Sequence, residues 1–377
     1  MKKTEIKGAV RVLIYAPGFE VGGIGTYLLN LIRRLSRNKN IEITLMCRVV
    51  KQDTELFSKL SSYNIRIITL GIPHLNAKTA VRFARGVDEV LRKENFDVLH
   101  MHSWKEPYVI CSAKRHGVRK IILHIHVATL FQYGGESNRI IKKIVKSNNI
   151  KKANLIMAPS KDIFEKDSKL LKSKEKVIAP NCIDTVCYAY DEEVRALERK
   201  TLQIAEDEIA IGHVGRVVEV KNHRFLVDVF ARVCNKVKAK LVLIGEGPLL
   251  EEIKGQVNEY GLGEKVIFLG RRDDVNRLLN ALDVFVFPSF SEGLGIAVIE
   301  AQCNGLPCVI SDTISDDAVV TDLVIKRSIK ESAEKWGQDI CEIGAIENRE
   351  RYAQLVREAG YGIDAIAKQV ETAYLER

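Results

Sequence analysis

Short apolar runs alternate with longer amphipathic stretches along most of this 377-residue chain. The apolar runs predict buried strands, and the helical spacing of apolar residues between them predicts covering helices. A first series of strands is predicted at 10–16, 41–50, 65–70, 97–102, 120–126 and 154–159, and a second at 209–214, 239–245, 265–269, 283–287 and 306–311. Strands that alternate with helices form parallel sheets covered by helices, so the chain is predicted to be an α/β protein with two Rossmann-like domains.

The boundary between the two series falls in the segment 176–184, where Pro180 and Asn181 interrupt the pattern. After the last predicted strand the spacing indicates three helices, at 332–344, 346–359 and 363–375. We therefore predict an N-terminal domain of residues 1–180, a second domain of residues 181–360 and a terminal helical segment of residues 361–377. Ligands of doubly wound sheets bind at the carboxyl ends of the strands, which here predicts a site in the cleft between the domains.

The most informative motif runs from Phe287 to Val309. The strand stops at Pro288, which cannot extend the hydrogen-bond ladder, and Gly293 and Gly295 punctuate a loop that leads into a short helix. The first N–H groups of that helix have no intrahelical partner, and the helix dipole favours an anion there. Glu292 before the helix and Glu300 within it are placed to meet a hexose and a ribose, although an ordinary turn and a solvated helix residue would give the same pattern.

Two further segments carry candidate phosphate-binding residues. Gly22 and Gly23, between the first strand and its helix, offer a backbone that a diphosphate can approach. This signal is weak, and the spacing matches neither a dinucleotide-binding motif nor a P-loop. Arg216 and Lys221 follow the first strand of the second domain and can neutralise two phosphate charges, the alternative being a pair of ordinary surface cations.

Four histidines lie at the ends of two strands of the first domain: His100, His102, His124 and His126. The i, i+2 spacing in each pair puts both imidazoles on one sheet face, a geometry that metals use. Because no third carboxylate or cysteine ligand is evident nearby, a hydrogen bond to a sugar hydroxyl is the favoured interpretation and no metal is predicted.

Charge divides the chain unevenly. Residues 1–184 hold 34 Lys and Arg against 16 Asp and Glu, whereas residues 185–377 hold 24 Lys and Arg against 33 Asp and Glu. A basic half can attract nucleic acid, an anionic membrane or a phosphorylated lipid, or be an ordinary solvated surface. Basic residues gather near two helix ends, and the second cluster lies on an amphipathic stretch suited to anionic lipid: Arg33, Arg34, Arg37, Lys39, and Lys142, Lys143, Lys146, Lys151, Lys152.

Neither the cysteines nor the apolar segments indicate an exported protein. The eight cysteines are scattered without a C-x-x-C pair, so we expect free thiols and neither a disulfide nor a zinc site built from them. No apolar run approaches the length of a membrane span, and the N-terminus lacks a secretory pattern. We therefore expect a cytoplasmic protein, peripheral at the inner face of the cell membrane.

Taken together, the two domains, the glycine loop, Gly215-Arg216, Lys221 and the Glu292-x7-Glu300 motif resemble the retaining GT-B glycosyltransferases of family four. The resemblance is greatest to transferases of bacterial capsule and exopolysaccharide biosynthesis. It implies a GT-B fold, in which two Rossmann-like domains face each other across a cleft and the C-terminal helix crosses back to the first domain. It also implies transfer of a hexose or N-acetylhexosamine, with retention, from a UDP-sugar to a polyprenyl-diphosphate-linked saccharide.

The resemblance assigns roles to individual residues. Glu292, His126, Arg216 and Lys221 would form the catalytic set, with His124 as an alternative to His126. No divalent metal would be required, because the acceptor proton passes to the leaving diphosphate. The donor would be held by the remaining matched positions: Gly22, Gly23, Asn181, Arg272, Gly293, Leu294, Gly295 and Glu300. Cys182 and Asn222 stand where the family usually has glycine, which puts the local turn geometry in question.

Three rival functions share these features. A UDP-sugar 2-epimerase has the same architecture but needs no acceptor. A non-catalytic sugar-nucleotide-binding subunit would keep the fold, although the intact acidic and basic motif residues argue against lost activity. Nucleic-acid binding is disfavoured, because the second half is acidic and no basic motif is interleaved with aromatic residues.

Overall fold

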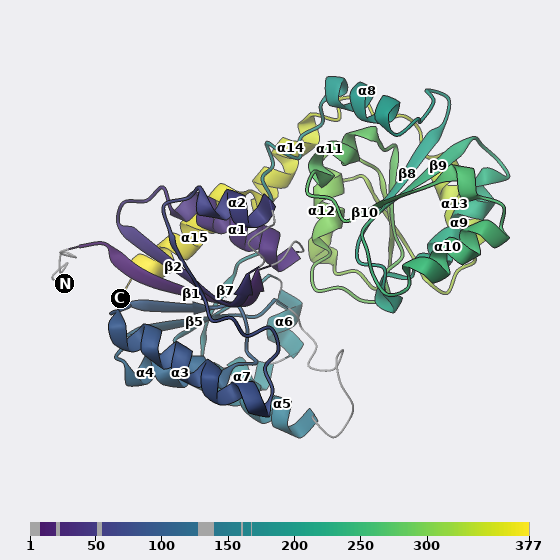
Figure 1. The fold of residues 1–377 in the computed structure, drawn as a ribbon. Coiled ribbons are helices and arrows are strands. Elements are labelled where there is room, and N and C mark those ends of the chain that lie inside the picture. Colours follow the sequence, from purple (N-terminus) through teal and green to yellow (C-terminus); the bar gives the residue numbers. More distant parts are fainter. Residues whose placement is uncertain are drawn as a thin grey trace. The chain divides into compact units, whose positions relative to one another are not determined.

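The computed structural model describes residues 8–19, 23–50, 55–126, 139–159, 161–166 and 168–376, and divides the chain into two compact units. The first unit comprises residues 1–182 together with 363–377, and the second comprises residues 183–362. The boundaries predicted from the sequence were 180 and 360. Each unit is a parallel sheet with helices packed on both faces (Figure 1).

The sheet of the first unit has seven strands in the order β3-β2-β1-β4-β5-β6-β7. Every adjacent pair is parallel, which follows from the helices that connect successive strands. The strands are β1 (Val10–Phe19), β2 (Ile41–Val50), β3 (Arg66–Thr69), β4 (Val98–Met101), β5 (Lys120–His124), β6 (Leu155–Ala158) and β7 (Glu175–Ile178). The helices are α1 (Gly23–Leu35), α2 (Glu55–Ser61), α3 (Ala77–Lys93), α4 (Pro107–Arg115), α5 (Arg139–Lys152), α6 (Lys161–Lys166), α7 (Ser168–Leu171) and α15 (Ile363–Leu375).

The sheet of the second unit has six parallel strands in the order β10-β9-β8-β11-β12-β13. The strands are β8 (Ile209–Val214), β9 (Ala239–Ile244), β10 (Val266–Gly270), β11 (Val284–Phe287), β12 (Cys308–Ser311) and β13 (Val324–Arg327). The helices are α8 (Glu192–Thr201), α9 (His223–Cys234), α10 (Leu250–Glu259), α11 (Val275–Leu278), α12 (Ile296–Cys303), α13 (Ala333–Glu342) and α14 (Arg351–Val356).

The C-terminal helix α15 packs in the first unit, as predicted. Its buried residues Ile366, Val370 and Tyr374 join the apolar cluster that contains the β1 and β2 side chains. Two polar contacts accompany this packing. Asp364 of α15 contacts Arg34 of α1, and Glu371 of α15 contacts Asn38, which lies just after α1. The last helix of the sequence therefore completes the core of the unit that contains the first strand.

All eight cysteines have free thiols, and all but Cys187 are at least partly buried. In the described part of the chain, no helix has the length and apolar character needed to cross a membrane.

Candidate active site

Two of the three predicted phosphate-binding loops, those after β8 and β11, meet at the carboxyl edge of the second sheet. Strands β8 and β11 are neighbours, so the segments that follow them emerge side by side. Two hydrogen bonds join these segments, one from the Asn222 side chain to the Pro288 carbonyl at 3.2 Å and one from the Phe290 N–H to the Val220 carbonyl at 2.8 Å. Because the two loops are tied together, residues predicted separately from each form one site.

The loop after β8 depends on residues that tolerate close packing or positive φ. A Cβ atom at Gly215 would lie 3.0 Å from Nε2 of His213 and 3.4 Å from Cδ and Cε of Lys221, so a side chain there would crowd the histidine first. Asn222 adopts the left-handed conformation, with φ 57° and ψ 45°, directly before α9. Asparagine is one of the few residues besides glycine that adopt this conformation readily, so it fits this position of the turn. Cys182, the other replacement, is buried and has no positive φ.

Lys221 and Glu292, both predicted to be catalytic, form an ion pair with Nζ and Oε1 2.6 Å apart. Their side chains are 18% and 15% exposed, so the pair is sheltered but remains accessible to a ligand. The Lys221 ammonium also lies 4.6 Å from the ring centroid of Phe287, within the range of a cation–π interaction. An ammonium has three donors, so Lys221 can hold Glu292 and still donate to an incoming phosphate oxygen.

The start of α12 provides backbone donors beside this pair. Gly295 is the N-cap residue, with φ 76° and ψ 50°, and no side chain caps the helix. Leu294 is buried and anchors the turn, while the Thr313 hydroxyl fixes the loop from the other side by donating to the Ser289 carbonyl at 2.8 Å. An uncapped N-terminus held in this way leaves N–H groups available to an anion, as the sequence predicted.

Glu300 lies on the second turn of α12 and is buried. Its Oε1 accepts a hydrogen bond from the Tyr188 hydroxyl at 2.9 Å. Burial raises the pKa of Glu300 to about 7, and the Tyr188 hydrogen bond opposes that shift. One carboxylate oxygen is thus already engaged, a contact that sequence analysis missed because Tyr188 lies in an irregular segment with no motif of its own.

The two predicted site arginines, Arg216 of the catalytic set and Arg272 of the donor-binding set, differ in their surroundings. Arg216 is exposed, and among the described residues none forms a hydrogen bond or ion pair with its side chain, which leaves its guanidinium available to a phosphate. Arg272, after β10, makes two hydrogen bonds to Asp274 at 2.8 and 2.5 Å. In this structure Arg272 is therefore held by a carboxylate.

The first unit holds the other predicted site residues. His126 is 8% exposed and its Nε2 lies 2.8 Å from Nδ1 of His102. Burial lowers the pKa of His126 to about 4, so His126 is neutral near pH 7. The side chain of Asn181, a second predicted site residue, opposes this shift. Gly23 begins α1, whereas Gly22 lies outside the described residues.

Comparison with known proteins agrees with this geometry. A family model for group 1 glycosyl transferases matches residues 194–359, and one for glycosyltransferase family 4 matches residues 21–186. The chain is 28% identical over 368 residues to the putative glycosyltransferase EpsF of Bacillus subtilis strain 168, covering 93% of this chain and 92% of EpsF. It is 27% identical over 243 residues to the UDP-Gal:alpha-D-GlcNAc-diphosphoundecaprenol alpha-1,3-galactosyltransferase of Escherichia coli, covering 62% of each.

Among solved structures, HepE of Anabaena in complex with UDP and glucose matches with a TM-score of 0.78 at 16% identity, over 98% of this chain and 100% of HepE. Two Rossmann-like units of this topology define the GT-B class of proteins. Since the two family models together span both units, the chain belongs to the family-four glycosyltransferases. The prediction of fold and family from the sequence is confirmed.

Proposed function

We propose that this glycosyltransferase moves a hexose or N-acetylhexosamine from a UDP-sugar, with retention, to a polyprenyl-diphosphate-linked saccharide in bacterial capsule or exopolysaccharide synthesis. The observation that carries the donor assignment is the set of positive groups on one sheet edge. Lys221, Arg216 and the uncapped start of α12 offer an ammonium, a guanidinium and backbone N–H groups. A diphosphate is the ligand that uses all three.

Support for the substrates comes from the relatives. HepE was solved with UDP and glucose, and the name of the Escherichia coli relative specifies both a UDP-sugar donor and a diphosphoundecaprenol-linked acceptor. In the site, Glu292 would accept hydrogen bonds from hexose hydroxyls. Glu300 would accept them from the ribose with the oxygen that Tyr188 does not use.

The proposed reaction breaks the bond between the anomeric carbon and the diphosphate oxygen and forms one to the acceptor oxygen on the same face. The acceptor proton passes to the departing diphosphate oxygen, so no side chain needs to act as a base. Negative charge grows on the diphosphate as the bond breaks, and groups fixed in advance around it lower the barrier. Lys221 and Arg216 take this role in place of a divalent metal, and we expect turnover without added Mg²⁺ or Mn²⁺.

The basic character of the first half supports an acceptor at an anionic membrane surface, but one lysine of the predicted clusters is buried. Lys146, predicted in a lipid-facing cluster, is 1% exposed and belongs to the interior. The side chains of Lys142 and Lys143 lie outside the described residues. Arg37 and Lys39, after α1, are exposed and remain candidates for lipid contact.

The donor and the reaction are tested together. Thermal shift with a panel of nucleotide sugars identifies the donor, after which nucleotide release is measured with a diphosphopolyprenyl-linked acceptor. NMR of the product gives the anomeric configuration. Lys221→Ala is expected to lose most turnover, while Lys254→Ala, which removes a lysine paired with Glu251 on the surface of α10, is the matched control.

Each alternative outcome has its own meaning. Full turnover by Lys221→Ala and by Glu292→Ala would refute the site assignment. Conversion of the UDP-sugar without acceptor would identify an epimerase, and donor binding without conversion would indicate a binding subunit. An inverted product would refute retention.

Membrane contact needs a separate measurement. Flotation with vesicles that contain anionic lipid is expected to recover the wild-type protein, and the Arg37→Glu/Lys39→Glu variant should be recovered less. The control changes two exposed lysines of the second unit, Lys238→Glu/Lys265→Glu. Equal recovery of both variants would exclude a specific surface after α1, and no recovery of the wild type would exclude lipid binding.

A further inference from the structure

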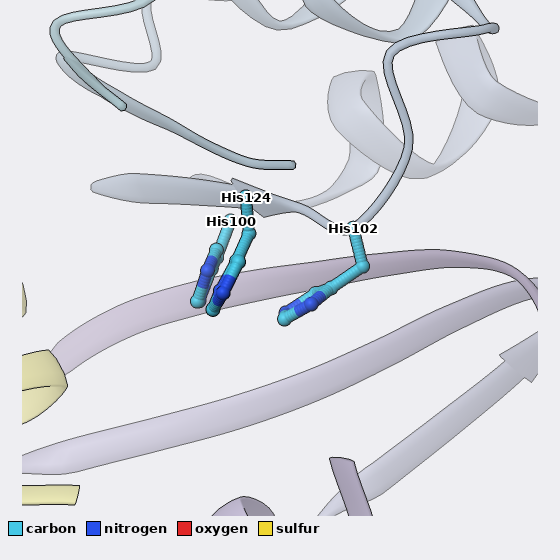
Figure 2. Close-up of side chains that lie close together, drawn as sticks. All are labelled: His100, His102 and His124. Atoms are coloured by element: carbon cyan, nitrogen blue, oxygen red, sulfur yellow. The ribbon is translucent and has the colours of Figure 1, made fainter. Parts of the chain in front are cut away.

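Four imidazoles are gathered in the interior of the first unit, at the carboxyl ends of the adjacent strands β4 and β5. His100, His102, His124 and His126 are at most 8% exposed. The centroids of the His100 and His124 rings are 5.5 Å apart, with planes inclined by 10°. Figure 2 shows that His100, His102 and His124 project to the same side of these strands.

The hydrogen bonds of this cluster engage one nitrogen on each of three rings, those of His100, His102 and His126. Nδ1 of His100 lies 2.6 Å from the Tyr374 hydroxyl of α15, and Nδ1 of His102 lies 2.8 Å from Nε2 of His126. The Nε2 atoms of His100 and His102 and both ring nitrogens of His124 are buried without a hydrogen-bond partner. A buried polar atom without a partner costs about 1–3 kcal/mol, so several in one place require an explanation.

This arrangement matches that of metal-binding histidines. Such residues present one ring nitrogen to the ion while the other is held by a hydrogen bond that fixes the tautomer and the ring orientation. In both His100 and His102, Nδ1 is engaged and Nε2 is buried without a hydrogen-bond partner among the described residues. One nitrogen from each of His100, His102 and His124 lies within 4.8 Å of the others. Ligands at about 2.05 Å around a tetrahedral ion are roughly 3.3 Å apart, so the nearly parallel rings of His100 and His124 must turn for their nitrogens to converge on one ion.

The chemical state of the rings also suits a metal. Neutral imidazole is the form that binds metals, since its lone pair is free at pH 7. Nitrogen ligands favour zinc and its neighbours in the first transition row over Mg²⁺ or Ca²⁺, which prefer oxygen.

We propose that His100, His102 and His124 bind one zinc ion, through Nε2 of His100 and His102 and one ring nitrogen of His124. The sequence favoured a sugar hydrogen bond for these histidines because it offered no carboxylate or cysteine as a third ligand. The third ligand is itself an imidazole, supplied by the neighbouring strand. The ion crosslinks β4 to β5 and, through the Tyr374 contact with His100, fixes α15. The proposed sugar transfer has no step that involves the ion.

Zinc binding has a consequence for His126, a predicted catalytic residue. With Nε2 of His102 on the ion, its Nδ1 carries the proton and donates to Nε2 of His126. His126 must then carry its own proton on Nδ1, a buried atom with no hydrogen-bond partner among the described residues. The ion thereby selects the tautomer of His126, so His102 acts as a positioning residue for it.

The test measures metal content and affinity on the full-length protein, purified without a histidine tag. We expect one zinc per chain by elemental analysis after dialysis, and tetrahedral d–d bands after replacement by Co²⁺. His102→Gln and His124→Gln should abolish stoichiometric zinc and these bands. Tyr374→Phe removes only the bond to His100 and should weaken zinc affinity by about 10–100-fold, as loss of such supporting partners does.

His74→Gln, which changes an exposed histidine, is the matched control and should bind as the wild type does. Substoichiometric zinc in the wild type would overturn the proposal. Unchanged zinc binding by His102→Gln and His124→Gln would overturn it as well. An equal loss of zinc in His74→Gln would also overturn it, because it would show adventitious binding to surface histidines. Should the ligand variants fail to fold, unchanged zinc affinity in folded Tyr374→Phe would refute the site.

Discussion

Glu300 offers a quantitative test of the donor site, because its burial must make the stability of the second unit depend on pH. Its pKa is raised from 4.5 to about 7 in the folded protein. A raised carboxyl pKa gives stability that is fully present below pH 4.5 and is lost as the pH rises through about 7. Between about pH 5.5 and about pH 8 this loss amounts to about 2 kcal/mol, at ~1.4 kcal/mol per pK unit.

The variant Glu300→Gln keeps an oxygen that accepts from Tyr188 but removes the ionisation. Its free energy of unfolding relative to the wild type should therefore rise by about 2 kcal/mol between the lower and the higher pH. The same variant should bind UDP about fivefold or more weakly, because a neutral acceptor forms a weaker hydrogen bond to ribose hydroxyls than a carboxylate does. The substitution is thus expected to stabilise the unit at high pH while impairing its function.

The assay uses the two tryptophans of the chain, Trp104 in the first unit and Trp336 in the second. In a Trp104→Phe background, fluorescence of the fully buried Trp336 reports urea unfolding of the second unit alone. Glu251→Gln changes an exposed glutamate and serves as the control. If the wild type and Glu300→Gln differ by the same free energy at both pH values, Glu300 does not titrate in this window and the reasoning is refuted.

Three further outcomes are expected. Lys221→Ala should lower turnover by about 10²–10³-fold, the usual effect of removing one preorganised donor, and a loss no larger than that of Lys254→Ala would contradict its role. Asn222→Gly should keep the left-handed turn and lose only the hydrogen bond to Pro288, whereas Asn222→Val should lose that bond and cost a further ~1–2 kcal/mol in the turn. Equal melting temperatures of the two variants would argue against the observed φ of 57°. Gly245→Ala should prevent proper folding of the second unit, because its Cβ would lie 2.0 Å from the Gly215 carbonyl oxygen. The control Gly255→Ala on α10 meets no atom within 4 Å and should raise the free energy of unfolding by about 0.5–1 kcal/mol. Circular dichroism and thermal melts distinguish the two outcomes.

The sequence predicted all of the buried strands and two of the four edge strands, β3 and β10. β7 and β13 were missed, and both are four-residue strands at sheet edges whose side chains are partly or fully exposed. An edge strand lacks the apolar run or strict alternation that periodicity detects. The two segments were interpreted instead as part of the interdomain joint and as the irregular region after the last strand.

For the site, the sequence predicted which residues gather but not how they pair. Lys221 and Glu292 were expected to face different parts of the donor, yet they contact each other. The partners of Glu300 and Arg272, namely Tyr188 and Asp274, follow from packing between segments, which local patterns do not encode. Lys146 shows the same limit, because a lysine in an amphipathic stretch is assumed to be solvated until the tertiary structure shows it buried.

The membership of α15 in the first unit determines the order in which the protein can fold as it is synthesised. The ribosome completes all of the second unit, residues 183–362, before it makes Ile366, Val370 and Tyr374. Until then the first-made strands lack the helix that covers part of their apolar core, and the Tyr374 hydroxyl is not there to hold His100. The nascent first unit must therefore remain incomplete while its successor folds, so premature termination near the C-terminus would damage the oldest part of the chain rather than the newest.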